Sequence, residues 1–212
     1  MGQRAISLAA TAKRKPRFQD TGHAQDYCSI AWRYAVGAVN DSKQTKHCKW
    51  VRLAALRFLR DYRNTRRSWR FDPWHANDVC DFIEKLPHVE GTWATTEIRL
   101  EPAQIFILVC VFGFRKKTDG TRRYSDVYIE MARKGAKSTL TGGISLYCLC
   151  CEGEQGPQVI VAATTAEQAG KVFKPAQGMV RKSADLREAF DLTAWSKSIT
   201  CDQNQGFIQP IN

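Results

Sequence analysis

The chain has 212 residues, of which 43% are hydrophobic, and a formal net charge of +11. This length and hydrophobic content allow a full core in one or two domains. No apolar run is long enough for a transmembrane helix, and the short apolar patch at 6–10 runs into Lys13-Arg14-Lys15, unlike a signal peptide. We therefore expect a cytoplasmic protein.

The positive charge is concentrated at the start of the chain. Residues 1–75 contain 16 Lys and Arg but only 5 Asp and Glu, whereas residues 76–212 contain 16 of each kind. This pattern predicts a polyanionic partner such as nucleic acid, although a solvated basic surface that keeps the protein soluble would give the same pattern. Cys148, Cys150 and Cys151 lie in an apolar run, and the eight cysteines include no second ligand pair at zinc spacing, so they predict no zinc site.

The first third is expected to be helical after a disordered arm. Residues 1–22 are polar and basic, and a core-forming segment is not expected there. Helices are expected at 26–38 and 47–63. In the second of these, one face carries Val51, Ala54, Phe58 and Tyr62. The opposite face carries the four cations that we expect to bind nucleic acid, Lys49, Arg52, Arg60 and Arg63.

Two prolines mark the starts of further helices. At Asp72-Pro73 an aspartate can cap the helix and a proline occupies its first turn. The apolar stripe of this helix is Val79, Phe82, Ile83 and Leu86, and Pro87 ends it. Pro102 opens a helix that is apolar nearly all round and extends to Phe114, so we expect it to be buried. A polar, hairpin-like loop follows at 115–123.

The pattern then changes to that of an α/β fold. Val127, Ile129 and Met131 alternate as in a strand, and a helix is expected at 138–151. The run Val159–Ala163 is typical of a parallel strand covered on both faces. A capping box at 165–168 opens a further helix, which Pro175 must kink or end. The segment therefore predicts a β-loop-α-β unit of a parallel sheet.

Lys137-Ser138 lies at the junction of the expected strand and helix, where a phosphate-binding loop is found. There, backbone N–H groups and a lysine ammonium bind phosphates, and a serine hydroxyl reaches Mg²⁺. The usual pattern is G-x-x-x-x-G-K-[ST], but Met131 and Ala136 stand where its glycines should be. Gly135 is one residue early. The strand-loop-helix context supports the assignment despite these departures.

Several segments, in this order and spacing, resemble the N-terminal part of large terminase subunits, the ATP-driven DNA-packaging motors of tailed phages and prophages. They are Arg57–Asp61, Phe71-Asp72, Phe82–Glu84, Leu100–Gln104, Phe112–Phe114, Ala132–Ser138 and Ala162–Ala169. Members of this family have a deviant phosphate loop of the R-K-x-x-K-S type, which Arg133–Ser138 matches.

The resemblance implies roles for individual residues. Lys137 would neutralise charge on the β- and γ-phosphates of ATP, and the Ser138 hydroxyl would bind Mg²⁺. Arg133 would act catalytically as a γ-phosphate sensor or a cis arginine finger, the alternative being a surface ion pair. Gln104 matches an adenine-reading glutamine, the alternative being a bond to the helix backbone. The remaining residues of the ATP-binding loop would be Lys134, Gly135, Ala136 and Thr139.

The resemblance also implies an architecture and partners. A helical region at 23–115 would precede the first part of a P-loop NTPase core at 116–212. The complete protein would package viral DNA into procapsids as a ring oligomer in the cytoplasm of the bacterial host, with double-stranded DNA, the small terminase subunit and the portal protein as partners and no membrane.

Acidic residues essential to such a motor are absent from this sequence. No apolar strand after Ala163 ends in Asp-Glu, and Asp185, Glu188 and Asp191 lie in a polar stretch. The second acidic motif and the nuclease domain of the family would lie beyond Asn212, so we expect a fragment, from a truncated gene or prophage remnant, that does not hydrolyse ATP. The alternatives are a non-catalytic DNA- or partner-binding remnant and a helicase-like P-loop ATPase.

Overall fold

The computed structural model describes residues 21–89 and 96–212, and the chain forms two compact units. The first takes in the chain up to Asp81 together with Leu100–Tyr128, and the second takes in Phe82–Arg99 and Ile129–Asn212. The expected arm at 1–22 lies almost wholly outside the described residues. The two units are interleaved in the sequence. The expected division into 23–115 and 116–212 is sequential, and it stays a prediction.

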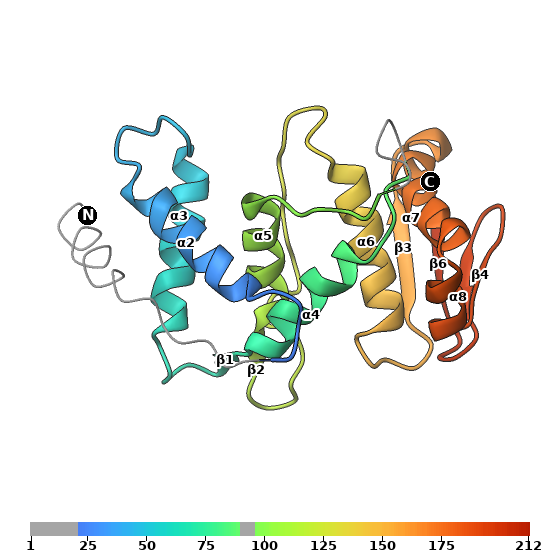
Figure 1. The fold of residues 1–212 in the computed structure, drawn as a ribbon, viewed down its shortest axis with the longest axis horizontal. Helices are drawn as coiled ribbons and strands as arrows, with labels where there is room; N and C mark the ends of the chain where they lie inside the picture. Colours follow the sequence, from blue (N-terminus) through green and yellow to red (C-terminus); the bar gives the residue numbers. More distant parts are fainter. Residues whose placement is uncertain (1–20, 90–95) are drawn as a thin grey trace. The chain divides into compact units, whose positions relative to one another are not determined.

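The first unit is mainly helical (Figure 1). Its elements are α2 (Tyr27–Asn40), α3 (Lys49–Tyr62), β1 (Trp69–Phe71), the greater part of α4 (Pro73–Glu84), α5 (Pro102–Gly113) and β2 (Phe114–Lys116). Helix α2 packs against both α3 and α5, and β1 pairs with β2 in antiparallel register. The four helices expected here are therefore confirmed, and the hairpin-like loop follows β2.

Aromatic side chains form the core of the first unit. The ring of Phe58 lies at its centre, and its centroid is 5.7–6.1 Å from those of Trp32, Phe71, Phe106 and Phe114. Edge-on arrangements of this kind are the favoured geometry for aromatic pairs. This cluster joins α2, α3, β1, α5 and β2 into one body.

The buried face of α3 is rotated from the expected one. Ala55, Phe58 and Leu59 are fully buried, whereas the other members of the expected apolar stripe, Val51, Ala54 and Tyr62, are only partly buried. Consequently Arg52 is also partly buried, while Lys49, Arg60 and Arg63 are exposed. The expected division of α3 into an apolar and a basic face is thus correct only in part.

The second unit is an α/β body. Its helices are α6 (Lys137–Cys150), α7 (Ala166–Lys182) and α8 (Ala184–Phe190), and its strands are β3 (Gln158–Ala162), β4 (Leu192–Ala194), β5 (Ile199–Cys201) and β6 (Gly206–Ile211). The strand order is β3-β6-β5-β4, with β3 and β6 parallel and the other neighbours antiparallel. The sheet is therefore mixed, which corrects the expectation of a parallel sheet.

Two expectations about strands are wrong. The segment Val127–Met131 forms no strand: Val127 is 49% exposed and Tyr128 87% exposed, because no neighbouring strand pairs with this segment among the described residues. Strand β3 is not covered on both faces either. Its exposed residues Ile160 and Ala162 alternate with the buried Val161, so one face of this strand is open.

Close packing of α6 against α7 fixes the start of α6 relative to the sheet. A Cβ atom on Gly142 would lie 3.0 Å from the backbone nitrogen of Ala176 and 3.4 Å from Cβ of Pro175. Pro175 lies inside α7, which continues to Lys182, so this proline does not end the helix. In this arrangement α6 begins at the end of the sheet at which β3 ends (Figure 1).

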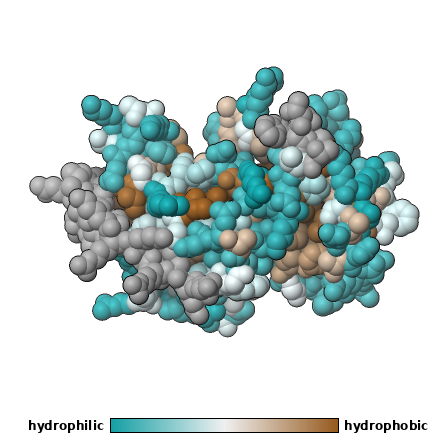
Figure 2. All heavy atoms as spheres, viewed as in Figure 1, coloured by the Kyte–Doolittle hydropathy of each residue, from teal (hydrophilic) through white to brown (hydrophobic). Residues whose placement is uncertain are grey.

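The face in Figure 2 is largely hydrophilic, with hydrophobic residues in restricted areas. Within residues 21–89 and 96–212, no helix combines the length and apolar character needed to cross a membrane.

Gly142→Ala should destabilise the second unit by roughly 1–3 kcal/mol, because the added methyl group meets backbone that cannot rotate away. Gly170→Ala is a matched control in α7, where a Cβ would meet no atom within 4 Å. This control should stabilise the protein by about 0.5–1 kcal/mol through helix propensity. Urea unfolding followed by circular dichroism measures both changes, and equal effects of the two substitutions would contradict the packing argument.

Candidate functional site

The loop at 131–136 enters α6 through strained backbone. Lys134 and Ala136 have φ angles of +66° and +54°, in the left-handed region that non-glycine residues rarely adopt. Gly135 lies between them, and its N–H donates to the carbonyl oxygen of Ala132 at 3.3 Å. Alternation of this kind turns successive backbone N–H groups toward one side, which forms an anion-binding concavity.

Two positions in this loop differ in how well their residues suit the backbone: Gly135 fits its turn, whereas Ala136 is strained. A Cβ atom on Gly135 would lie 3.2 Å from the Ala132 carbonyl oxygen, so glycine permits the tight turn. Ala136 adopts the left-handed conformation for which the usual motif supplies glycine, and a non-glycine residue there costs about 1–2 kcal/mol. Strain of this size persists only where the surrounding structure enforces it.

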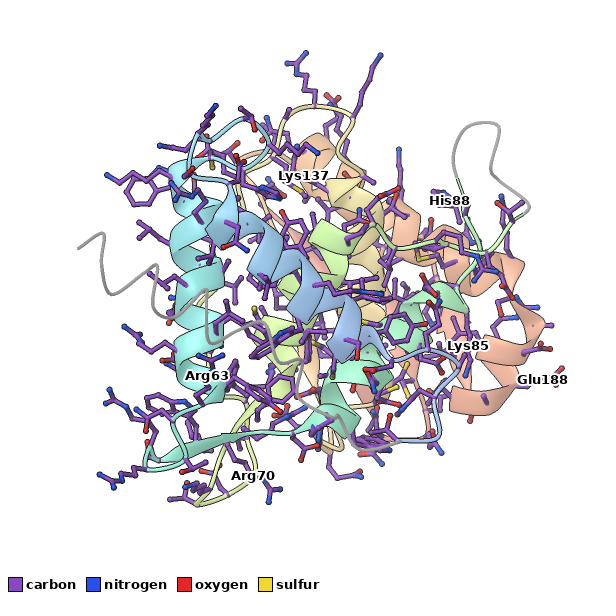
Figure 3. The ribbon with its side chains drawn as sticks, turned by 60° about the vertical axis from the view of Figure 1, so that its left-hand side comes forward. Arg63, Arg70, Lys85, His88, Lys137 and Glu188 are labelled. Carbon is purple, nitrogen blue, oxygen red and sulfur yellow. The ribbon has the colours of Figure 1, made fainter. Side chains whose placement is uncertain are left out.

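Lys137 closes the loop through its side chain. Its ammonium donates to the carbonyl oxygens of Met131 and Ala132, both at 2.7 Å. An ammonium has three N–H groups, and these two bonds use two of them. The remaining N–H and the full positive charge stand at the first residue of α6, where Figure 3 labels the side chain.

The N-terminus of α6 is suited to an anion. Ala136 is the N-cap and its side chain makes no capping hydrogen bond, and the first turn contains no acidic residue. The N–H groups of the first turn have no partner inside a helix and carry the positive end of its dipole. Ser138 and Thr139 lie in this turn and are partly buried, while Arg133 and Lys134 are exposed in the loop before it.

Loop 131–139 therefore brings together the predicted residues Arg133, Lys134, Gly135, Ala136, Lys137, Ser138 and Thr139. The sequence did not indicate the left-handed backbone at Lys134, nor that the carbonyl groups of Met131 and Ala132 anchor Lys137. The sequence carries no signal for the positive φ of Lys134. For Ala136 the signal is its position, where the usual pattern has glycine.

Gln104 lies in the first unit, and its side chain bonds to the helix backbone, which is the alternative that the sequence left open. Its Oε1 atom accepts a hydrogen bond from the N–H of Glu101 at 2.9 Å, within a capping box at the start of α5. To bond to adenine, this amide would have to share its oxygen or release the cap. Adenine recognition by Gln104 therefore stays a prediction.

The three carboxylates singled out from the sequence, Asp185, Glu188 and Asp191, lie on or next to α8 rather than in the loop. Glu188 lies on α8 and is well separated from Lys137 in Figure 3. Asp185 is in the first turn of α8, and Asp191 caps its C-terminus with φ +50°. Over the residues that the structure describes, no group of three or more His, Cys, Asp and Glu side chains is arranged to hold a metal ion.

Comparisons with known proteins agree on one family. Residues 102–201 match the sequence model of the family described as "Terminase large subunit, ATPase domain". This range contains Gln104, the whole loop and α6.

One relative and one solved structure come from the same phage. The large terminase subunit of Enterobacteria phage HK97 is 31% identical over 123 residues, which are 57% of this chain and 23% of that protein. The crystal structure of the HK97 large terminase matches with a TM-score of 0.53 and 27% identity, over 65% of this chain and 27% of that one. The chain thus spans about a quarter of the length of these relatives, and its residues 102–201 are similar to the ATPase domain of terminase large subunits.

Proposed function

We propose that loop 131–139 binds the phosphates of ATP, as part of a phage DNA-packaging ATPase. The observation that carries this proposal is the combination of an uncapped helix N-terminus, two left-handed residues before it and the Lys137 ammonium held at its entrance. The match of residues 102–201 to the terminase ATPase domain supports the same activity. This geometry concentrates positive potential without an acidic side chain in the first turn of α6.

Individual side chains have distinct roles in this proposal. Lys137 bonds a β- or γ-phosphate oxygen, and Arg133 contacts the γ-phosphate, where negative charge grows during phosphoryl transfer. Ser138 supplies one hydroxyl ligand to Mg²⁺, an ion that usually keeps several waters and phosphate oxygens and needs few protein ligands. The ion itself would neutralise phosphate charge. Gln104 reads adenine if it exchanges its bond to Glu101.

The activity of the complete protein is proposed by analogy with its relatives. ATP hydrolysis would drive double-stranded DNA into procapsids, in a ring oligomer that meets the small terminase subunit and the portal protein in the cytoplasm of the bacterial host. The chain spans 23% of the HK97 terminase large subunit, and the activity and partners of the complete protein are therefore part of this proposal.

A second function has one observation in its favour. Hydrolysis needs a carboxylate to activate water, and Asp185, Glu188 and Asp191 belong to α8 rather than to the loop. The 212-residue chain by itself would then bind nucleotide without hydrolysing it, as expected of a non-catalytic binding piece. A helicase-like ATPase has no comparable observation in its favour.

Lys137→Ala should abolish ATP binding, because it removes the charge nearest to the proposed phosphate position. Lys197→Ala is a matched control: it removes the same charge from an exposed position in the second unit and should leave binding unchanged. Isothermal titration with ATP and Mg²⁺ measures both variants, with thermal unfolding to show that they fold. Neither variant nor the parent chain should hydrolyse ATP. Robust hydrolysis by the 212-residue chain would mean that its catalytic carboxylate has been overlooked.

Ala136→Gly should increase the free energy of unfolding by about 0.5–1 kcal/mol, because relief of left-handed strain exceeds the added backbone entropy. Ala166→Gly, in the first turn of α7, is the matched control and should lose about 0.5–1 kcal/mol. Chemical denaturation measures the difference. If both glycines destabilise equally, Ala136 is not strained in solution.

Arg133→Ala should lower ATP turnover by the complete protein far more than it lowers ADP affinity. A contact to the γ-phosphate strengthens as charge develops in the transition state, and ADP lacks that phosphate. Single-turnover kinetics and ADP titration separate the two effects. Equal losses of ADP and ATP affinity, with turnover of bound ATP unchanged, would instead make Arg133 a general phosphate ligand.

A further inference from the structure

Strand pairing in the first unit gathers cations that the sequence keeps apart. Strands β1 and β2 place Trp69 opposite Lys116 and Arg70 opposite Arg115. The N–H of Lys117 also donates to the carbonyl oxygen of Ser68 at 2.9 Å. We call the resulting cluster the basic end. It comprises Arg66, Arg67, Arg70, Lys116, Lys117 and Arg122, of which all but the partly buried Arg122 are exposed.

The register of the basic end places like charges opposite one another. Arg70 lies opposite Arg115 in the β1–β2 ladder, and an isolated bridge places Arg115 opposite Arg122. Like charges directly opposite across strands are destabilising. Arg115 avoids part of this cost because it is buried and its Nε donates to the carbonyl oxygen of Phe112 at 3.1 Å. The repulsion among the others falls when an anion binds.

Aromatic rings and a backbone carbonyl group contact several cations of the basic end. The guanidinium of Arg67 lies 5.5 Å from the ring centroid of Trp69, and that of Arg122 lies 5.3 Å from the ring of Phe112. The ammonium of Lys117 donates to the carbonyl oxygen of Thr65 at 2.8 Å. The contacts of Arg67 and Lys117 orient these side chains through an aromatic ring and a carbonyl oxygen, neither of which carries a counter-charge.

Two carboxylates lie close to the basic end. Arg70 Nη2 is 3.4 Å from Oδ2 of Asp72, an exposed pair that contributes little. Asp119 lies in the turn after β2, and its Oδ1 accepts from the hydroxyl and N–H of Thr121 at 2.6 and 2.9 Å. These two bonds lower the pKa of Asp119, so it is ionised at neutral pH. The cations still outnumber these two acids.

We propose that the basic end binds the phosphate backbone of duplex DNA, an inference that rests on the proposed packaging function. Its exposed members are arginines and lysines from two strands and their connections. Such a surface suits phosphate contacts that carry no sequence information. On α3, by contrast, partial burial of Arg52 interrupts the expected basic set.

A charge-matched pair of triple variants tests the location. One variant carries Arg66→Gln, Arg70→Gln and Lys116→Gln in the basic end. The control removes three exposed charges elsewhere in the first unit, through Arg33→Gln, Lys43→Gln and Lys46→Gln. Fluorescence anisotropy with a labelled duplex, over a series of salt concentrations, measures the dependence of log affinity on log salt for each chain. Thermal unfolding checks that the variants fold.

The slope of log affinity against log salt should become shallower by about 0.9 for each phosphate contact removed. The magnitude of this slope should therefore fall by roughly 2–3 in the basic-end variant, while the control keeps the slope of the parent. Arg66→Glu against Lys43→Glu repeats the comparison with single charge reversals if the triple variant does not fold. Equal losses in both variants, no loss in either, or no binding of duplex by the parent at low salt would each overturn the inference. ATP titration of the parent then separates the two proposals: retained ATP binding with a negative DNA result leaves the nucleotide site standing.

Discussion

The Lys137 ammonium closes the loop on its own backbone, and the geometry of the candidate site depends on this closure. Its bonds to the carbonyl oxygens of Met131 and Ala132 tie the first residue of α6 to the chain that precedes the turn. With these ends tied, Lys134 and Ala136 can remain in the left-handed region despite their Cβ atoms. The same residue that would bind phosphate thus also holds the loop in the conformation in which its N–H groups converge.

Packing of α6 against α7 connects the loop to the rest of the second unit. The absence of a side chain at Gly142 lets α6 approach α7 at Pro175 and Ala176. Because Pro175 lacks an N–H, α7 gives up one helical hydrogen bond at the place where the two helices meet. The N-terminus of α6 is therefore positioned by backbone contact rather than by adaptable side chains, as a site for a rigid anion requires.

In the first unit, a buried carboxylate ties separate segments together, as the Lys137 ammonium does in the loop. Asp61 on α3 is only 4% exposed, and its two oxygens lie 3.1 Å from Nε of Arg60 and 2.8 Å from Nη1 of Arg123. The guanidinium of Arg123 also lies 3.6 Å from the ring centroid of Trp69. This group joins α3, β1 and the segment after β2, and it holds the strands from which the basic end projects. Loss of Asp61 would leave Arg123 facing the interior without its counter-charge.

The sequence by itself determined helices α2 to α7 and the position of the loop, whereas the short helix α8 was not predicted. Local signals define these features: capping residues such as Thr165, a proline at the start of α5, and the apolar stripe along α4. The family resemblance carried by Ala132–Ser138 rests on the identity and order of residues, and the family match at 102–201 confirms it. None of this depends on which distant segments meet.

Only the tertiary structure decided the strands, the left-handed turn and the gathering of charge. A strand needs a partner, so the alternation at Val127–Met131 was insufficient, while the short strands β4 and β5 form because β5 pairs with β6 and β4 pairs with β5. Likewise, the backbone of Lys134 and Ala136 is set by bonds across the loop, and the basic end exists because β1 and β2 pair across more than forty residues of sequence. Pairing between remote segments is a property of the folded chain, and no local pattern in one sequence encodes it.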